Sequence, residues 1–365
     1  MQKYPSTRVT WSAALLATVF LCLMAYLFAW QLTASGSSGK LNATLLPCTA
    51  DQRIVPLRSG VLFSDGTHLH ALDSRGRQVW AHLAGTGSGF DVSEGGVSVW
   101  LGNKLTLLSA ETGVPFALSG TVTGNILSAR LGTIYAAVQT GTEHNSTLYV
   151  LSRDGGRVDE VAMPDQTVLD YGFFSGGSLL WTLSLDTEGT IPKSVITTRR
   201  PGRAVTGDIQ QTRQILYKAF FHANDLRAVD DSFLHTFNYQ GKEDLESRIL
   251  VYGWHLVDED GAGESALMAF VPSAQANANT PISDVRLIRG KADRTVRMPF
   301  PCFAVAAHDG KLYGFSRSHI MIRELGDDKA MTYQIPIEAD RFFGMTDRGA
   351  AILASGNQVF LINTR

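Results

Sequence analysis

The chain has 365 residues, of which 44% are hydrophobic and 18% are charged, and its formal net charge is −2. A charge this balanced argues against a nucleic-acid-binding groove and against a strongly basic membrane-binding surface. The sequence contains 35 glycines, which separate short apolar segments. That pattern is typical of a turn-rich β protein rather than a helical one.

The first feature along the chain is an uncharged interval between Arg8 and Lys40. Inside it, the apolar segment from Trp11 to Trp30 has about the 20 residues that a helix needs to cross a hydrocarbon core of roughly 30 Å. Tryptophan stands at both ends, where indole rings prefer the headgroup level. We predict a transmembrane helix over residues 11–32. A cleaved signal peptide is the alternative.

The flanks of this segment predict how the chain is oriented. Lys3 and Arg8 lie on the short N-terminal side, and no charge follows the segment until Lys40. Positive residues favour the cytoplasmic side of a membrane. We therefore expect a cytoplasmic tail over residues 1–10, a flexible linker of small polar residues over 33–40, and residues 41–365 outside the cytoplasm, with the protein a single-pass component of the cell membrane.

Beyond the linker, one pattern recurs: an apolar strand, a tight turn, a second alternating strand and another turn. In residues 60–80 the first turn contains Asp65-Gly66, a pair suited to the positive φ angles of a hairpin. Four further copies follow. They occupy residues 96–113, 133–156, 302–315 and 350–362. The interval from 165 to 300 is less regular, with a strand expected over Ser178–Leu183 and another over Arg248–Trp254.

Repeated hairpin units predict an all-β chain folded as a β-propeller. A blade takes roughly 40–45 residues, so about 317 residues give seven blades, with eight as the alternative. A ring of blades leaves only short sheet edges, whereas a two-sheet sandwich rarely needs so many equivalent units. Three strands are expected near the C-terminus, at 342–346, 350–354 and 358–363. The segment from Leu41 to Pro56 is expected to supply a fourth strand and close the ring.

Residues 69–80, Leu-His-Ala-Leu-Asp-Ser-Arg-Gly-Arg-Gln-Val-Trp, resemble the repeat of quinoprotein-like and WD-repeat-like propellers. The shared order is alanine, any residue, aspartate, a turn glycine, a basic residue and tryptophan. Residues 107–113 form a looser copy, and the spacing between Asp73 and Gly76 is one residue short. The layout as a whole resembles membrane-anchored propeller proteins of clostridial-type bacteria. That resemblance implies the fold, but that family has no assigned activity.

Three cysteines occur in the sequence. Cys22 lies in the apolar N-terminal segment, whereas Cys48 and Cys302 fall in the part expected outside the cytoplasm. An oxidising compartment would allow a disulfide between Cys48 and Cys302. The alternative is two unpaired thiols in separate parts of the ring.

Metal-binding patterns are weak. His68 and His70 share one face of an expected strand, but no third ligand can be identified. The acidic run Asp258-Glu259-Asp260-Gly261 with Glu264 lacks the ligand spacing of a calcium loop, and we expect a solvated turn there.

The sequence contains no nucleophile elbow, phosphate-binding glycine loop or dinucleotide fingerprint. We assign no catalytic, cofactor or metal residues and expect a binding protein rather than an enzyme. The leading prediction is a binding or scaffold module for a protein, glycan or small ligand docked on a propeller face. The alternatives are a degenerate quinoprotein-like oxidoreductase or hydrolase, and an envelope-assembly or sensor component.

Overall fold

The structure is a computed structural model that describes residues 39–364, apart from 120–121, 175, 212–213, 223–224, 239, 262–265, 278–279 and 328. In this part of the chain the regular elements are 33 β-strands and two short 3₁₀ turns, Leu245–Ser247 and Ser273–Gln275. None of its helices could cross a membrane. The helix predicted over residues 11–32 lies outside the described residues, as do the tail and most of the linker.

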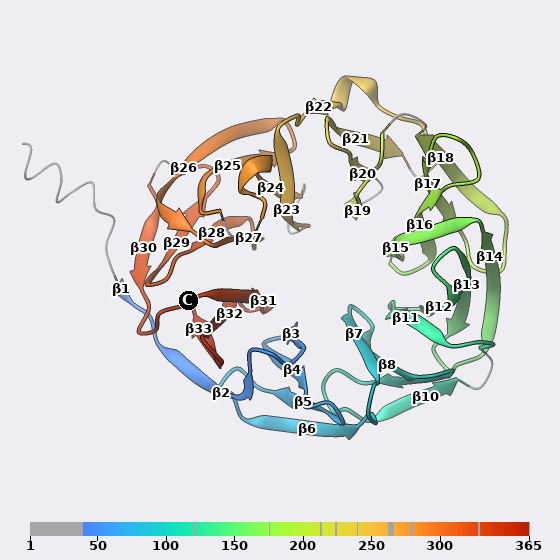
Figure 1. The fold of residues 1–365 in the computed structure, drawn as a ribbon, viewed down its shortest axis with the longest axis horizontal. Helices are drawn as coiled ribbons and strands as arrows, with labels where there is room; N and C mark the ends of the chain where they lie inside the picture. The colour runs from blue at the N-terminus through green and yellow to red at the C-terminus, as the bar shows by residue number, and fades with distance from the viewer. Residues whose placement is uncertain are drawn as a thin grey trace, which may run out of the picture.

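The strands form consecutive four-stranded antiparallel units that are arranged around a ring (Figure 1). The first strand of each unit lies nearest the middle of the ring. The first four units are β3–β6 (Ile54–Leu57, Gly60–Ser64, His68–Leu72, Gln78–Leu83), β7–β10 (Gly89–Ser93, Gly96–Leu101, Lys104–Leu108, Pro115–Ser119), β11–β14 (Ile126–Leu131, Tyr135–Thr142, Asn145–Ser152, Arg157–Pro164) and β15–β18 (Gln166–Phe174, Leu179–Asp186, Lys193–Arg199, Val205–Gln211).

The second half of the chain repeats this arrangement. Its units are β19–β22 (Lys218–His222, Asp225–Val229, Phe233–Asn238, Ile249–Leu250), β23–β26 (Trp254–Asp260, Leu267–Pro272, Ile282–Arg289, Ala292–Cys302), β27–β30 (Ala304–His308, Lys311–Phe315, His319–Glu324, Met331–Gln334) and β31–β33 (Arg341–Met345, Ala350–Ser355, Gln358–Asn363) with β2 (Ala43–Thr49). The units β11–β14 and β15–β18 are joined into one sheet by a single parallel pairing, Asn145 with Gln166.

The N-terminal strand β2 completes the last unit. It pairs antiparallel with β33, so residues from both ends of the described chain form one sheet with β31 and β32. Arg341 in β31 also donates a hydrogen bond of 2.6 Å to the carbonyl oxygen of Ala50. The predicted closing strand and the three predicted C-terminal strands are therefore confirmed.

Strand β1 (Gly39–Lys40) adds a short fifth strand to the outer edge of the unit β27–β30. It pairs in parallel with β30, Gly39 opposite Tyr333 and Lys40 opposite Gln334. The last two residues of the predicted linker thus lie along the rim of the ring.

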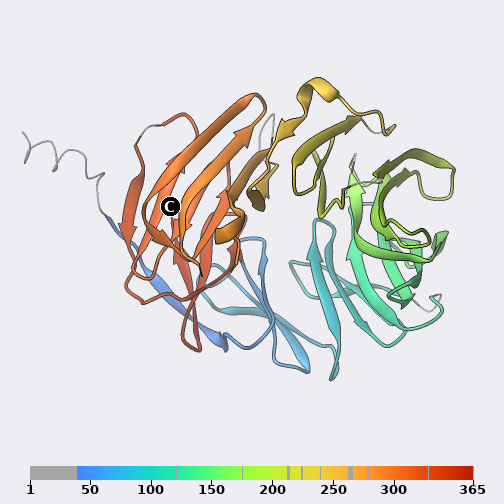
Figure 2. The same cartoon turned by 45° about the horizontal axis from the view of Figure 1, so that its top comes forward.

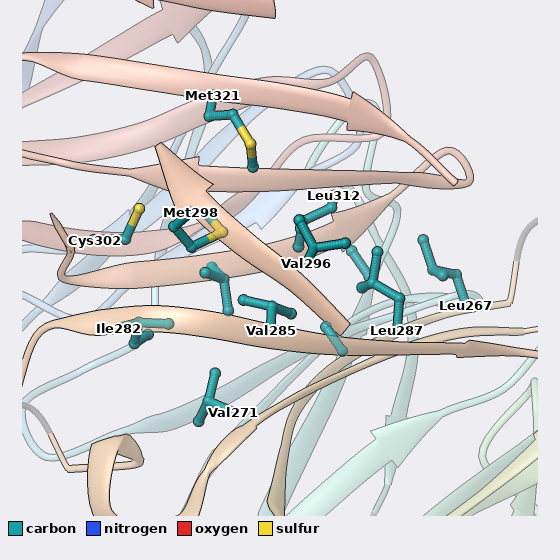
Figure 3. Packing of buried hydrophobic residues seen from close by; sticks show 13 residues of the cluster. Leu267, Val271, Ile282, Val285, Leu287, Val296, Met298, Cys302, Leu312 and Met321 are labelled. Carbon is teal, nitrogen blue, oxygen red and sulfur yellow. The ribbon is translucent and has the colours of Figure 1, made fainter. Parts of the chain in front are cut away.

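The hydrophobic core is divided among the interfaces between neighbouring units, whose sheets stand face to face around the ring (Figure 2). Each cluster takes side chains from two adjacent sheets. Between β23–β26 and β27–β30, for example, Val285 and Val296 pack with Met298, Cys302 and Met321 (Figure 3). Another such cluster joins the last unit to the first, with Leu46 and Ile352 against Val61. This cluster closes the ring by packing as well as by strand pairing.

One predicted strand is wrong. The segment Arg248–Trp254 contains only the two-residue strand β22, followed by a turn in which Gly253 has φ +82° before β23 begins at Trp254. The apolar residues of this segment therefore belong to the outer strand of one unit and the inner strand of the next. An apolar run cannot by itself distinguish one continuous strand from two strands joined by a turn.

Candidate functional site

A cavity with a volume of about 680 Å³ lies inside the ring. It is bounded by five innermost strands, β7, β11, β15, β19 and β23, and by the turns that follow the first three of them. Its lining residues are Ser93, Glu94, Arg130, Leu131, Gly132, Asp170, Gly172, Phe173, Phe174, Gly176, Gly177, Trp181, Lys218, Ala219, Phe220, Phe221 and Glu259. We call this space the inner cavity.

Backbone irregularities lie beside the acidic side chains near the inner cavity. In β15 the pairing with β16 shifts register between Val168 and Asp170. In β23 a similar shift occurs between Leu256 and Asp258. A bulge of this kind changes the direction in which the following side chains point. Because of these two shifts, the side chains of β15 and β23 do not alternate strictly between the two faces of the sheet.

One wall of the inner cavity carries an ion-paired arginine. Nη1 of Arg130 lies 2.8 Å from Oδ1 of Asp170 and also donates to the carbonyl oxygen of Tyr171. On its other side, Nε of Arg130 lies 3.9 Å from Oδ2 of Asp91. Burial alone would lower the pKa of Arg130, but the attraction of Asp170 and Asp91 outweighs burial and raises that pKa. The charge of Arg130 is therefore shared between two carboxylates of neighbouring inner strands.

The opposite wall carries two charges without a direct partner. Within the described residues, the side chains of Lys218 and Glu259 make no hydrogen bond and no ion pair within 4 Å. Burial raises the pKa of Glu259, although the attraction of Lys218 partly offsets this effect. A smaller cavity of about 160 Å³ adjoins these same two residues and extends along Tyr217, His255 and Asp258.

Aromatic rings complete the inner cavity. Phe174 and Phe221 stack with their ring centroids 3.7 Å apart, and Trp181 lies 5.9 Å from Phe221. Gly172 is paired with Trp181 across the β15–β16 ladder. A Cβ atom at position 172 would lie 3.0 Å from Nε1 of Trp181, so glycine allows the largely buried indole to pack directly against the backbone of β15. The cavity thus combines charged walls with apolar ring surfaces.

The acidic run at Asp258–Asp260 corrects the sequence analysis, which placed it in a solvated turn. These residues belong to β23, an innermost strand. Oδ2 of Asp258 accepts a hydrogen bond of 2.9 Å from the backbone of Ala307, and Oδ2 of Asp260 accepts one of 2.7 Å from the backbone of Gly310. Burial is the main cause that raises the pKa of Asp258 to about 6. The carboxylates bind one unit to the next; Glu264 lies outside the described residues.

The two histidines considered as a metal pair take part in local hydrogen bonds. Nε2 of His70 lies 2.9 Å from Oδ2 of Asp65, and its Nδ1 lies 2.9 Å from Gln78. His68 contacts the hydroxyl group of Thr67 at 2.9 Å. No group of three metal-ligating side chains occurs among the residues that the structure describes.

Cys48 and Cys302 lie in different core clusters, and both are free thiols. Cys48 belongs to β2 in the last unit and Cys302 to the end of β26, and the unit β27–β30 lies between these two units around the ring. Burial raises the pKa of Cys48 to about 11 and that of Cys302 to about 12. A thiol with so high a pKa carries little thiolate at neutral pH and is a poor nucleophile.

Sequence reasoning placed a ligand on the top face or in the central channel of the propeller, but it did not identify the residues that line the inner cavity as a site. A usable signal was the single charged residue within an otherwise apolar innermost strand, as with Arg130 in β11. Its partner Asp170 is 40 residues away, close to the length of one unit. The pairing could be recognised only once each innermost strand had been identified.

No protein-family model and no curated protein matches this sequence. Solved structures do match. The computationally designed protein Ika8 superposes with a TM-score of 0.59 at 9% identity, covering 87% of this chain and 98% of that chain. BamB from Moraxella catarrhalis gives 0.53 at 11% identity, covering 90% and 100%. The WD40 domain of Pan2 from Neurospora crassa gives 0.51 at 11% identity, covering 91% and 98%.

This chain has the β-propeller fold. Two of the matches are a WD40 domain and BamB, which supports the propeller type expected from residues 69–80. Identities this low establish the fold alone. The propeller's function must therefore be argued from its own residues.

Proposed function

We propose that this protein is a membrane-anchored, extracytoplasmic propeller that acts as a binding scaffold, and that a protein partner inserts into its inner cavity. The observation that carries the proposal is the cavity itself. Its volume of about 680 Å³ falls within the roughly 300–1,000 Å³ range of ligand sites. Its half-buried charges, Lys218 and Glu259, lack direct partners among the described residues.

We also propose that the ring has eight blades, which is the alternative rather than the preferred number from the sequence. Each four-stranded unit would count as one blade, with β11–β14 and β15–β18 as two blades despite their shared sheet. A separate hydrophobic cluster between each pair of adjacent units supports this count.

The anchor is proposed from the sequence of residues 11–32. The position of β1 adds a geometric consequence. Gly39 is held at the edge of β30, so only six residues lie between it and residue 32. The seven Cα-to-Cα steps from residue 32 to Gly39 span at most about 25 Å. The rim formed by β30 and β1 would therefore stay close to the membrane surface.

The partner-binding proposal is tested with a photo-crosslinking residue, p-benzoylphenylalanine, in the full-length chain in membranes. One variant places it at Phe173, which lines the inner cavity, and the other at Val79, an exposed residue of the outer strand β6. We expect a discrete crosslinked protein species at position 173 that is missing at position 79. The same species from both positions, or none from position 173, would overturn the proposal.

The anchor and its orientation are tested separately. A reporter phosphatase that is active only outside the cytoplasm is fused after residue 365, and the membranes are washed at alkaline pH. We expect an active fusion that stays in the membrane pellet. Release of the chain into the supernatant, or an inactive but stable fusion, would contradict the proposed anchor or its orientation.

A further inference from the structure

We propose that the inner cavity binds an organic cation, namely an ammonium or guanidinium group attached to an apolar body. This inference rests on the proposed function and deepens it. The cation would be a lysine or arginine side chain of the partner protein, or a free amine of the same chemistry. Three features of the described residues carry the inference: the balance of charge, the state of the carboxylates and the aromatic walls.

The balance of charge around the inner cavity is negative. Three carboxylates line it, and the two lining cations are Arg130 and Lys218. Oδ2 of Asp91 in β7 lies 3.9 Å from Nε of the lining residue Arg130, and Asp258 and Asp260 flank Glu259 in β23. The six acidic residues are Glu94, Asp91, Asp170, Asp258, Glu259 and Asp260. A cleft with low-dielectric walls concentrates such a field and attracts positively charged ligands.

The cations of the protein itself do not neutralise these carboxylates fully. Arg130 is already engaged by Asp170 and lies near Asp91. Even so, Oδ2 of Asp91 is inaccessible to solvent and has no hydrogen-bond partner. Burial raises the pKa of Asp91 above its ordinary value despite the nearby arginine.

Glu259, on the opposite wall, resembles Asp91 in this respect. Burial outweighs the attraction of Lys218 and raises the pKa of Glu259. A buried carboxylate gains stability when a cation approaches it. A bound ammonium group would therefore compensate charge that the folded chain leaves uncompensated.

The walls of the inner cavity favour an organic cation over a bare metal ion. Phe173 and Phe221 are half-buried lining residues, and the largely buried Trp181 also contributes to the lining. Aromatic faces attract ammonium and guanidinium groups and pack against their alkyl chains. A metal ion would instead need several ligands around one point, and the described residues hold no such group.

An anionic ligand is the main competing occupant, since Lys218 is available for a carboxylate. The six nearby acidic side chains oppose this alternative, because an anion would add to a negative charge that is already poorly compensated. The two alternatives make opposite predictions for Lys218. If the ligand is a cation, Lys218 competes with it for the carboxylates. If the ligand is an anion, Lys218 is the main group that binds it.

The experiment compares three probes of similar size against the full-length protein in detergent at pH 7.5, by calorimetry and by tryptophan fluorescence. The probes are 2-phenylethylammonium, 2-phenylethanol and 3-phenylpropionate. We expect the ammonium probe to bind at least tenfold more tightly than the alcohol, and the carboxylate to bind most weakly. Equal binding of all three probes, tighter binding of the carboxylate, or no binding of the ammonium probe would overturn the proposal.

Substitutions then locate the site. We expect Glu259→Gln to weaken binding of the ammonium probe at least tenfold and Lys218→Met to strengthen it several-fold. The matched control is Glu338→Gln, an exposed glutamate outside the cavity, which should leave affinity unchanged. Loss of ammonium binding in Lys218→Met, with melting temperature unchanged, would contradict a cation site.

Two capped peptides, acetyl-Phe-Arg-amide and acetyl-Phe-citrulline-amide, separate the two sources of the cation. Tighter binding of the arginine peptide than of the free amine indicates a protein side chain, and the reverse indicates a small amine. Equal binding of the arginine and citrulline peptides counts against the cation. If the cation probes fail while position 173 still crosslinks a specific protein, this inference is overturned and the scaffold proposal stands.

Discussion

At the residue scale, the tryptophan that ends the resemblance motif joins two blades. Trp80 in β6 is buried, and its Nε1 donates a hydrogen bond of 3.1 Å to the carbonyl oxygen of Ala110 in the next unit. Its ring lies against Gly113, whose φ is +65°. A Cβ atom at position 113 would lie 2.5 Å from Cδ2 of the ring. The glycine is thus required both by its backbone conformation and by the close approach of the indole.

Replacing Gly113 with alanine should lower the free energy of unfolding by about 2 kcal/mol or more, because strain at positive φ adds to a clash with Trp80. Gly102 is a matched control. Its φ is +61°, but nothing lies within 4 Å of the added Cβ, so Gly102→Ala should cost only about 1 kcal/mol. Urea unfolding of both variants measures the difference. Equal costs would show that the indole contact is not tight.

A buried histidine forms a second residue-scale feature. Nδ1 of His235 lies 2.7 Å from Glu243 and Nε2 lies 2.8 Å from Asp230, so both ring nitrogens face carboxylates. Arg248 makes a two-point contact with Glu243 at 2.9 and 2.7 Å. Burial alone would lower the pKa of His235, but the hydrogen bonds to Asp230 and Glu243 outweigh it and raise that pKa. A protonated imidazole can donate to both carboxylates at once.

The same geometry occurs in the first unit with a neutral partner. Asp65 and Asp230 each accept hydrogen bonds from the backbone two and three residues later and contact a histidine five residues later. In the first unit, however, the other nitrogen of His70 faces Gln78 instead of a carboxylate. The two sites therefore form a natural pair for comparing a histidine between two carboxylates with a histidine between a carboxylate and an amide.

We expect His235→Gln to destabilise the fold by about 3–5 kcal/mol, because it leaves the fully buried carboxylate of Asp230 without its cation. His70→Gln should cost about 1 kcal/mol.

A raised histidine pKa gives stabilisation that is complete below the unfolded value of 6.5 and is lost as the pH rises through the folded value. The difference in the free energy of unfolding between wild type and His235→Gln should therefore become smaller between pH 6 and pH 9. A gap that is independent of pH would contradict a protonated His235.

This repetition can be read in the sequence, as Asp-Gly-Thr-His-Leu-His at 65–70 and Asp-Asp-Ser-Phe-Leu-His at 230–235. The third partner also recurs at the same spacing, since Gln78 and Glu243 each lie eight residues after their histidine, but one is an amide and the other a carboxylate. Local spacing predicts a turn and its cap. It does not predict which side chain from another strand completes the contact.

At the scale of elements, the closing strand β2 is the clearest success of the sequence analysis. The last three strands of the chain lacked a partner, and an apolar segment near the linker was available to supply it. Side-chain exposure changes sharply between neighbouring residues of β2. Leu45 is 56% exposed, whereas Leu46 is 3% exposed and belongs to the cluster between the last and first units. Neighbouring leucines in one strand therefore have opposite roles.

Leu46→Ala should lower the free energy of unfolding by about 2–4 kcal/mol through lost burial and a cavity at the ring closure. Leu45→Ala should change it by less than about 0.5 kcal/mol. Hydrogen exchange adds a local readout, since the amides of β33 should lose protection in the first variant only. Equal effects of the two substitutions would mean that the register of β2 is wrong.

The elements that the sequence analysis misplaced are those whose environment depends on a neighbouring unit. Asp258 and Asp260 are too acidic to suggest an innermost strand, yet backbone amides of Ala307 and Gly310 satisfy them there. The short strand β22 was merged with Trp254, the first residue of β23, because most residues from Ile249 to Trp254 are apolar. The hydrophobic pattern predicted the strands that belong to regular hairpins. It failed to predict strands whose polar side chains are hydrogen-bonded to a neighbouring unit.

At the scale of the whole molecule, the presence of a hydrophobic cluster between every two adjacent units explains why the chain forms a closed ring. Each sheet is covered on both faces by its neighbours, and the first and last units cover each other. The sequence predicted this closure from the number of equivalent hairpins. It could not predict where charge gathers inside the ring, because that depends on five innermost strands spaced over more than 150 residues.

Ring closure is tested most directly by pulsed electron-spin distances between labels on exposed outer positions. Labels are placed by Val79→Cys in the first unit, Leu250→Cys in β22 and Gln358→Cys in β33, in a Cys22→Ala background with the unsubstituted chain as the labelling control. A closed ring predicts that the 79–358 distance is clearly shorter than the 79–250 distance, although 358 is much farther along the chain. A 79–358 distance longer than the 79–250 distance would contradict the closed propeller.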